Sequence, residues 1–430
     1  MTPSAEWIRR DADVVWHGFT QMASFAGDAP VIVERAEGRE LVDVDGRRYL
    51  DAISSLWVTT IGHRVPELDA ALTDQVGRVA HSTMLGNGNR VVIELAEALA
   101  EVVPVDRPHV LFASDGAVAV EQALKVAFQY WVNVGVEGRR RYLALGDAYH
   151  GDTVGSLSLG DGGFGADLFD PLRFGVLRAP GFDDPQSLEV AAEMVREHRD
   201  ELAAVVVEPL VQGAAGMQIA PAEVFAALGA ACEETGVLLI CDEVATGFGR
   251  TGALFASELC GLRPDILCLG KGITGGYLPM SATIANRRVY EAFLGDDLGP
   301  RTFYHGQSYG GNALAAAVAL RHLRLIDELD VLANVREREV GLRALLDQRV
   351  TPLPQVADVR LQGLMGGVEL HPAEGERRGR ETCKAAVARG VLLRSLGDVV
   401  VLMPPLTVAA AEIERIVDVL AEAIEAAVPE

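Results

Sequence analysis

Cysteine is scarce in this chain, and its few copies show no functional spacing. There are 5 cysteines among 430 residues, an odd number, and none forms the C-x-x-C pair typical of zinc sites and redox dithiols. A disulfide framework and a metal site are therefore not expected. Several of these thiols lie in apolar runs, so we interpret them as reduced core residues of a cytoplasmic protein. The cysteines are Cys232, Cys241, Cys260, Cys268 and Cys383.

Long apolar segments are also missing. No stretch reaches the roughly 18 uncharged apolar residues that a transmembrane helix needs. The N-terminal string MTPSAEWIRRDADVVWHGF contains acids and no continuous apolar core, so we expect no signal peptide. The expectation is a soluble, cytoplasmic protein that neither crosses nor binds a membrane.

Positive charge is in deficit. The chain has 38 Lys and Arg residues against 61 Asp and Glu residues, and its net charge is −23 at pH 7. Such an acidic surface disfavours nucleic acid and anionic membranes, so neither is an expected partner. The net charge of the whole chain does not determine the charge of a local site, which can still contain several arginine and lysine residues.

What the chain does have is a regular alternation of short apolar runs and helix-like stretches over residues 65–320. The apolar runs cover residues 110–113, 142–145, 204–207, 237–241, 266–269 and 281–284. Such short continuous runs are typical of buried strands in a mainly parallel sheet, with helices on both faces. The pattern predicts an α/β fold whose ligands collect at the carboxyl ends of the strands.

The two ends of the chain follow a different pattern. Residues 31–60 indicate short strands with a turn at Asp45-Gly46. Beyond about residue 320, a long helix over 316–340 precedes short strands and a final helix over 409–427. We therefore predict a large domain over 63–320 and a smaller α+β domain that combines 1–62 with 321–430.

Charged residues close two of the apolar runs. Asp242 and Glu243 follow one run, and Lys271, flanked by glycines, follows the next. A buried carboxylate needs a fixed cation, and a desolvated lysine can act as a nucleophilic amine. Pyridoxal phosphate (PLP) requires both, because its aldehyde condenses with a lysine and its protonated ring nitrogen pairs with a carboxylate. The structural alternative is that Asp242 caps a helix and Lys271 is a solvated loop charge.

Three further strand ends carry small or polar residues. Gly116 and Ala117 follow a strand and open a helix, where backbone N–H groups can bind an anion. Tyr149 offers an aromatic face, and Glu208 ends another buried run. Each residue taken singly is more often structural. Together they place an anion cradle, a flat ring, acids and a lysine at one edge of one sheet.

One longer motif carries a family resemblance. The string DEVATGFGRTG over residues 242–252, followed by Gly270-Lys271-Gly272, resembles the class III, fold-type I, PLP-dependent aminotransferases. Within this class the chain is most similar to the branch that makes 7,8-diaminononanoate for biotin. That narrower similarity rests on WHGFTQM (16–22), SSLW (54–57), HST (81–83), QYW (129–131), YHGDT (149–153), KGITGGYLP (271–279), and Arg394 before MPP (403–405).

The resemblance implies a homodimer with active sites at the interface and a role for each matching residue. Lys271 would hold the PLP aldehyde and move protons, Asp242 would pair with the ring nitrogen, and Tyr149 would complete the catalytic set by stacking on the ring. The implied cofactor contacts are Gly116, Ala117, Tyr149, Glu208, Asp242, Val244, Lys271 and Ser308 of the partner subunit. The implied substrate contacts are Phe19, Trp57, Asp152, Arg250, Gly306 and Arg394, with Arg394 on the keto acid carboxylate.

The implied reaction is a ping-pong transamination that converts 8-amino-7-oxononanoate to 7,8-diaminononanoate. Phe19 stands where many members that use S-adenosylmethionine have tyrosine, so the resemblance favours lysine over S-adenosylmethionine as amino donor. The alternatives are a broader ω-amine or diamine:keto acid transaminase and a PLP-binding homologue without turnover. Trp57 and the string around Phe19 argue against the first, and the intact Lys271, Asp242 and Arg394 against the second.

Overall fold

A seven-stranded sheet forms the centre of the computed structural model, which describes residues 2–161 and 166–428. The strand order is β4-β12-β11-β10-β7-β5-β6. Neighbouring strands are parallel, except that β12 runs antiparallel to both β11 and β4. The strands are β4 (His109–Ala113), β5 (Arg141–Leu145), β6 (Leu177–Ala179), β7 (Leu202–Val207), β10 (Leu238–Asp242), β11 (Ile266–Leu269) and β12 (Ser281–Ala285).

The α/β fold class expected from the alternating pattern is confirmed. Each of the six predicted runs forms a strand, with ends that differ by no more than two residues. Every residue of β7, β10 and β11 is buried, which explains why these strands have no polar alternation. The short strand β6 was not predicted, because three residues are too few to show a period.

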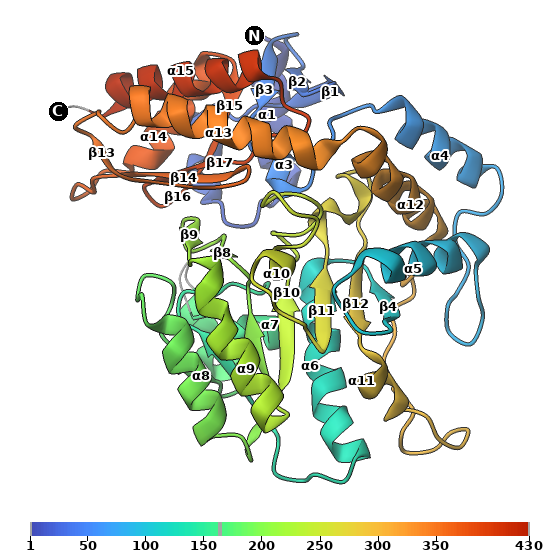
Figure 1. Cartoon of the computed structure of the whole chain (residues 1–430). Helices are drawn as coiled ribbons and strands as arrows, with labels where there is room; N and C mark the ends of the chain where they lie inside the picture. The colour runs from blue at the N-terminus through green and yellow to red at the C-terminus, as the bar shows by residue number, and fades with distance from the viewer. Residues whose placement is uncertain (1, 162–165, 429–430) are drawn as a thin grey trace.

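Helices cover both faces of this sheet, as Figure 1 shows. Side chains of α8 (Ser187–Glu197) and α9 (Phe225–Thr235) pack with one set of strand residues, and those of α6 (Gly116–Asn133) pack with the alternate set. Successive strand residues point to opposite faces, so one buried strand serves both layers. The sheet is therefore rigid, and the carboxyl ends of its strands are fixed relative to the start of α6.

The two ends of the chain build a second unit together. Strand β15 (Val391–Leu392) pairs in parallel with β3 (Arg48–Asp51), which joins β1 (Val33–Glu37) and β2 (Glu40–Asp43). In Figure 1 the N-terminal and C-terminal segments accordingly lie side by side above the large sheet. The other strands and helices of this unit are β13 (Val356–Gln362), β14 (Met365–Leu370), β16 (Arg394–Leu396), β17 (Val399–Leu402), α14 (Arg378–Ala388) and α15 (Ala410–Ala427). The domain boundaries at 62 and 320 stay predictions.

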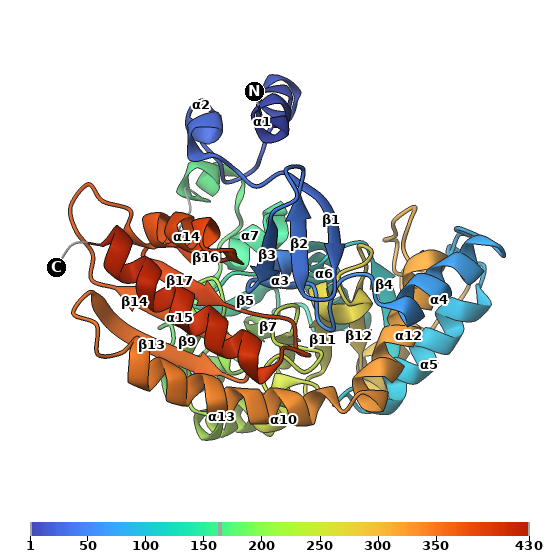
Figure 2. The same ribbon diagram turned by 90° about the horizontal axis from the view of Figure 1, so that it is seen from above.

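The single long helix predicted over 316–340 is wrong. Two helices occupy this region, α12 (Ala313–Glu328) and α13 (Val331–Arg349), and Figure 2 shows α13 running beside α15. Asp330 separates them with a left-handed φ of 47°. Aspartate tolerates this conformation better than most residues. A single aspartate in a sequence of high helix propensity is nevertheless too weak a signal to predict a break in the helix.

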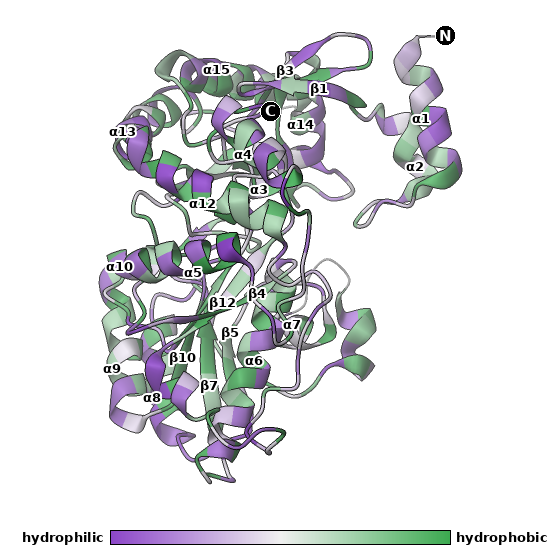
Figure 3. Ribbon diagram, turned by 90° about the vertical axis from the view of Figure 1, so that its right-hand side faces the viewer, coloured by the Kyte–Doolittle hydropathy of each residue, from purple (hydrophilic) through white to green (hydrophobic). Residues whose placement is uncertain are grey.

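The N-terminal segment stands at one side of the molecule. Figure 3 shows α1 (Pro3–Val14) and α2 (Met22–Phe25) there, next to the strands of the second unit. All five cysteines are buried and unpaired, as expected for core thiols. In the described parts of the chain, every helix is too short or too polar to cross a membrane.

Candidate active site

Lys271 follows the carboxyl end of β11 and lines a cavity of about 730 Å³. Its backbone has a left-handed φ of 40°, unusual for a residue with a side chain. Burial lowers the pKa of the Lys271 amine, although the charges of Asp242 and Glu208 favour its protonated form. A lysine that loses its proton more easily than usual is a better nucleophile and proton acceptor.

Asp242 is the last residue of β10 and is buried at 5% exposure. Its Oδ1 accepts a hydrogen bond from the N–H of Val244 at 3.1 Å, and its Oδ2 lies 2.7 Å from Nδ1 of His150. Burial opposes the charged form of His150, but the hydrogen bond to Asp242 and the charges of Asp242 and Glu208 outweigh it and raise the pKa of the ring. The carboxylate of Asp242 thus has a fixed partner in a buried place, because it favours the positively charged form of the His150 ring.

His150 is a functional candidate that the sequence pattern did not identify. Its ring is buried, and its Nε2 has no hydrogen-bond partner among the described residues. His150 therefore acts on the site through Asp242, whose orientation it holds. The available signal was its place between Tyr149 and Gly151, directly after a strand.

Glu208 lies close to this pair at the end of β7. Its two carboxylate oxygens accept hydrogen bonds from the N–H groups of Tyr149, at 3.2 Å, and Gly213, at 3.3 Å. Burial raises its pKa to about 7, the charge of His150 opposes that shift, and the charge of Asp242 adds to it. Glu208 thus links the backbone of the Tyr149 turn to the acid cluster beneath it.

Glycines allow neighbouring segments to pack closely against the start of α6. A Cβ on Gly116 would lie 2.5 Å from Cγ1 of Val244, and a Cβ on Gly151 would lie 2.4 Å from the Cβ of Ala117. The carboxylate of Asp115 accepts the N–H of Val118 at 3.1 Å, while the first N–H groups of a helix have no intrahelical acceptor. Gly116 and Ala117 can therefore present N–H groups to an anion.

Tyr149 lines the same cavity as Lys271. Its hydroxyl donates a hydrogen bond of 2.9 Å to Oδ2 of Asp152, and burial together with this bond raises the pKa of the phenol. Asp152 itself is exposed and does not line the cavity. The structure thus connects Asp152 to the site through Tyr149.

Trp57 forms another wall of the cavity. The segment α3 (Ser54–Trp57) has left-handed φ values at Ser54, Ser55 and Trp57, of 51°, 60° and 65°. Each such residue costs about 1–3 kcal/mol, so surrounding bonds must hold the segment. Asp51 accepts the N–H of Ser55 at 2.8 Å, and Ser54 Oγ donates to the carbonyl of Met403 at 2.6 Å. The Nζ of Lys271 lies 5.0 Å from the centroid of the Trp57 ring.

The cavity brings together three of the six residues implied for substrate. Phe19, Trp57 and Arg394 line it together with Lys271 and Tyr149. The remaining lining residues are Thr20, Gln21, Leu56, Ala214, Glu376, Arg377, Arg380, Ser395, Leu396, Gly397 and Asp398. An apolar and aromatic wall with arginines at one side suits a ligand that has an apolar chain and an acidic end.

Arg250 does not reach the cavity. Its side chain is 2% exposed, its NH1 donates to the carbonyl of Pro404, and its NH2 lies 3.3 Å from Ser54 Oγ. Burial lowers its pKa to about 9, with the charge of Asp51 opposing the shift. In the structure Arg250 supports the Trp57 segment through Ser54, and its substrate contact stays a prediction.

Gly306 and Ser308 also lie outside the cavity of their own chain. Both are exposed, and the carbonyl of Ser308 lies 2.6 Å from Nε2 of His81. A Cβ on Gly306 would lie 2.7 Å from a methyl group of Leu85. These residues therefore belong to a surface formed by residues 81–85 and 304–309.

These groups fit a flat cofactor with an aldehyde, a ring nitrogen and a phosphate. Lys271 supplies an amine, Asp242 supplies a buried anion, and the start of α6 supplies N–H groups. The close approach of Val244 to Gly116 makes a narrow wall beside that helix start. The site thus has a partner for each of the three reactive or charged parts of such a molecule.

Comparisons with known proteins agree with this geometry. The family model described as aminotransferase class-III matches residues 22–424. The adenosylmethionine-8-amino-7-oxononanoate aminotransferase of Nitratidesulfovibrio vulgaris is 45% identical, over 96% of this chain and 80% of that protein. The crystal structure of the enzyme of that name from Methanocaldococcus jannaschii has a TM-score of 0.95 at 36% identity and covers 99% of both chains. A PLP-bound amine transaminase from an uncultivated Pseudomonas species has a TM-score of 0.89 at 33% identity, over 96% of this chain and 99% of that one.

Proposed function

Because the chain belongs to the class III aminotransferase family, we propose that it uses PLP to transfer an amino group to 8-amino-7-oxononanoate, forming 7,8-diaminononanoate for biotin. The observation that carries this proposal is the cavity in which Lys271 meets Trp57 and Arg394, with Asp242 close by. The names of the similar proteins support the choice of substrate.

Bound PLP supplies an aldehyde that takes up the amino group and a protonated ring that accepts electrons from the substrate carbon. Asp242 would stabilise the positive charge of the ring nitrogen, and His150 orients Asp242 through the 2.7 Å contact of its Nδ1. Gly116 and Ala117 would hold the phosphate through their N–H groups, and Tyr149 and Val244 would hold the ring. Glu208 stabilises this arrangement through the Tyr149 backbone.

Lys271 would hold the cofactor and would move a proton at its Nζ. The lowered pKa favours a neutral amine that can accept the proton of the donor's α-carbon. Trp57 and Phe19 cover the apolar chain of the substrate and exclude water. Arg394 binds the carboxylate, since a guanidinium and a carboxylate can form two parallel hydrogen bonds.

A broader amine:keto acid transaminase is the second candidate. Its support is the similarity of the chain to the Pseudomonas amine transaminase. We also propose that the enzyme acts in the cytoplasm, supported by its five buried, unpaired thiols, which persist in a reducing compartment.

The amino donor is testable by measuring each half-reaction alone. We expect S-adenosylmethionine to convert the bound cofactor to its amine form and 8-amino-7-oxononanoate to restore it. The absorbance near 420 nm should fall and then recover, and mass spectrometry should detect 7,8-diaminononanoate. The preference for lysine predicted from Phe19 lacks support, because the similar proteins are named for adenosylmethionine.

Lysine at a matched millimolar concentration is the control for this assay. A fall in absorbance with lysine alone would restore the argument from Phe19 and leave the acceptor unchanged. Restoration by pyruvate but not by 8-amino-7-oxononanoate would favour the broader transaminase.

The enzyme is expected to be a homodimer in which Ser308 contributes to the partner's cofactor site. The surface of residues 81–85 and 304–309 supports this, because Leu85, Tyr304 and Tyr309 are about two-thirds exposed, at 64%, 66% and 66%. Such a grouped apolar surface is typical of an interface. Sedimentation should give twice the mass of the chain.

Mixed dimers test the cross-subunit role of Ser308. Lys271→Ala and Ser308→Glu should each be nearly inactive alone, the second because a carboxylate repels the phosphate. If Ser308 acts across the interface, one site of each mixed dimer is intact, and random mixing restores about a quarter of wild-type activity. No recovery in verified mixed dimers would place Ser308 in its own subunit's site, and an active monomer would contradict the interface.

A further inference from the structure

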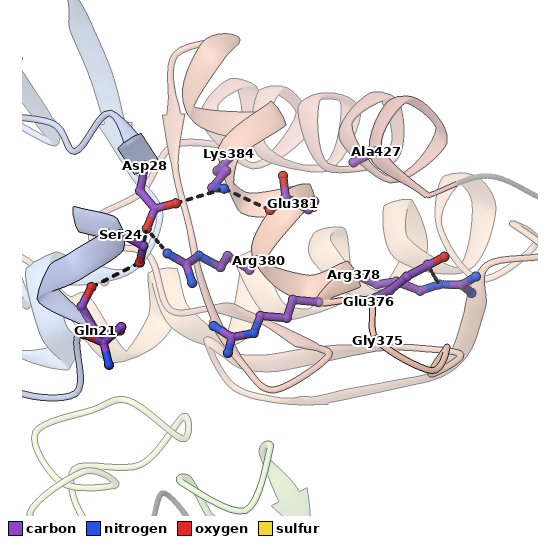
Figure 4. Close-up of a pocket in the computed structure, with 11 residues that line it drawn as sticks. Gln21, Ser24, Asp28, Gly375, Glu376, Arg378, Arg380, Glu381, Lys384 and Ala427 are labelled. Atoms are coloured by element: carbon purple, nitrogen blue, oxygen red, sulfur yellow. Dashed lines mark hydrogen bonds and ion pairs between the residues drawn. The ribbon is translucent and has the colours of Figure 1, made fainter. Parts of the chain in front are cut away.

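Three arginines line the cavity that contains Lys271, and they differ in their partners. Arg380 forms an ion pair with Asp28, which also lies 3.2 Å from Nζ of Lys384, as Figure 4 shows. Arg394 is the arginine already expected on the substrate carboxylate. Like Arg394, Arg377 makes no side-chain hydrogen bond or ion pair with the residues that the structure describes, and no signal in the sequence distinguished it.

The residues next to Arg377 hold its backbone in place. Arg378 donates to Glu376 at 2.8 Å and to the carbonyl of His371 at 3.0 Å. The N–H of Gly379 donates to Asp398 Oδ1 at 3.1 Å, and a Cβ there would lie 2.6 Å from the carbonyl oxygen of Gly397. The start of α14 is thus clamped to the turn after β16, the strand that carries Arg394.

The acids on the cavity wall do not neutralise Arg377. Glu376 is paired with Arg378, and Asp398 accepts the N–H of Gly379. Arg377 is exposed, so water solvates its guanidinium group while the cavity holds no ligand. A ligand anion is the partner that the cavity can supply.

We propose that Arg377 is a specificity-determining residue that binds a substrate carboxylate beside Arg394. This inference rests on the proposed function, in which amino donor and keto acceptor each carry a carboxylate and use one pocket in turn. The two molecules hold that group at different distances from the reacting carbon. Two separate guanidinium groups on one wall can serve both positions, and each carboxylate needs only one of them.

The test compares Arg377→Ala and Arg377→Lys with Arg263→Ala, an exposed arginine away from the cavity. Steady-state rates are measured with 8-amino-7-oxononanoate and its methyl ester, and with S-adenosylmethionine and its decarboxylated analogue. Arg377→Ala should raise KM about tenfold for the carboxylate whose site it forms, with kcat changed less than twofold. The ester or decarboxylated analogue should show no such change, and Arg377→Lys should recover part of the loss.

If KM rises for 8-amino-7-oxononanoate, Arg377 binds the carboxylate of the acceptor. If KM rises for S-adenosylmethionine, Arg377 binds the carboxylate of the donor. Equal KM values for Arg377→Ala and Arg263→Ala in both arms would overturn the inference. Calorimetric binding of nonanoate and S-adenosylmethionine to the wild-type holoenzyme separates the two levels of the proposal. One outcome is that the wild type binds these ligands and Arg377→Ala weakens that binding, while the wild type does not convert 8-amino-7-oxononanoate. That result would count against the proposed function and not against the role of Arg377.

Discussion

Replacement of Lys271 by alanine is expected to abolish both turnover and covalent attachment of the cofactor. Of the three lysines in the chain, Lys125, Lys271 and Lys384, only Lys271 lines the cavity, and burial lowers the pKa of its amine. Loss of attachment and of proton transfer together should lower kcat by roughly 10⁵-fold or more, about 7 kcal/mol. Borohydride reduction followed by peptide mapping should label Lys271 in the wild type and no peptide in the variant.

Two matched variants make this result specific. Lys271→Arg keeps the positive charge but has no attacking amine, so it should be as inactive as the alanine variant. Lys384→Arg changes a surface lysine that pairs with Asp28 and Glu381, and it should retain wild-type activity. Borohydride label on Lys125 or Lys384 in the wild type would overturn the central assignment.

Asp242→Asn should leave the cofactor bound and remove nearly all activity. The amide has the shape of the carboxylate but not its charge, so the ring nitrogen loses its proton and withdraws electrons poorly. We expect kcat/KM to fall on the order of 10³-fold, about 4 kcal/mol, with the cofactor content measured by absorbance unchanged. His150 lies 2.7 Å from this carboxylate, and its raised pKa should fall in the variant because the anion that favours its charged form is gone.

The control for this variant is Asp358→Asn. Asp358 is half exposed, pairs with Arg360 on the surface of β13 and does not line the cavity. Its loss should change stability by less than about 1 kcal/mol and leave kcat unchanged. Activity of Asp242→Asn within tenfold of wild type would contradict the role of the charge.

The predicted strands agree with the structure because burial on both faces produces an uninterrupted apolar run. That signal is local and survives in any context. The break between α12 and α13 was missed because it depends on one backbone angle at Asp330, whose φ is 47°. The pairing of β3 with β15 could not be predicted either, since these strands lie hundreds of residues apart in the chain. The apolar pattern of a strand does not specify which other strand it pairs with.

The candidate site divides in the same way. Lys271, Asp242 and Glu208 were identified because charge at the end of a buried run is rare and has few structural explanations. The substrate contact of Arg250 stays a prediction, because a motif position does not state whether a side chain reaches the cavity or, as here, donates to a backbone carbonyl behind it. His150 and Arg377 did not stand out in the sequence, since the roles proposed for them depend on which groups surround them.

The sequence by itself determined the fold class, the family and the chemical type of the site, because each follows from local patterns of apolar and charged residues. Only the tertiary structure decided which polar groups meet. His150 reaches Asp242 across 92 positions, and Gly116 accommodates Val244 because it has no Cβ. The physical reason is that hydrogen bonds and close packing depend on distances in space, which are set when distant segments fold against one another.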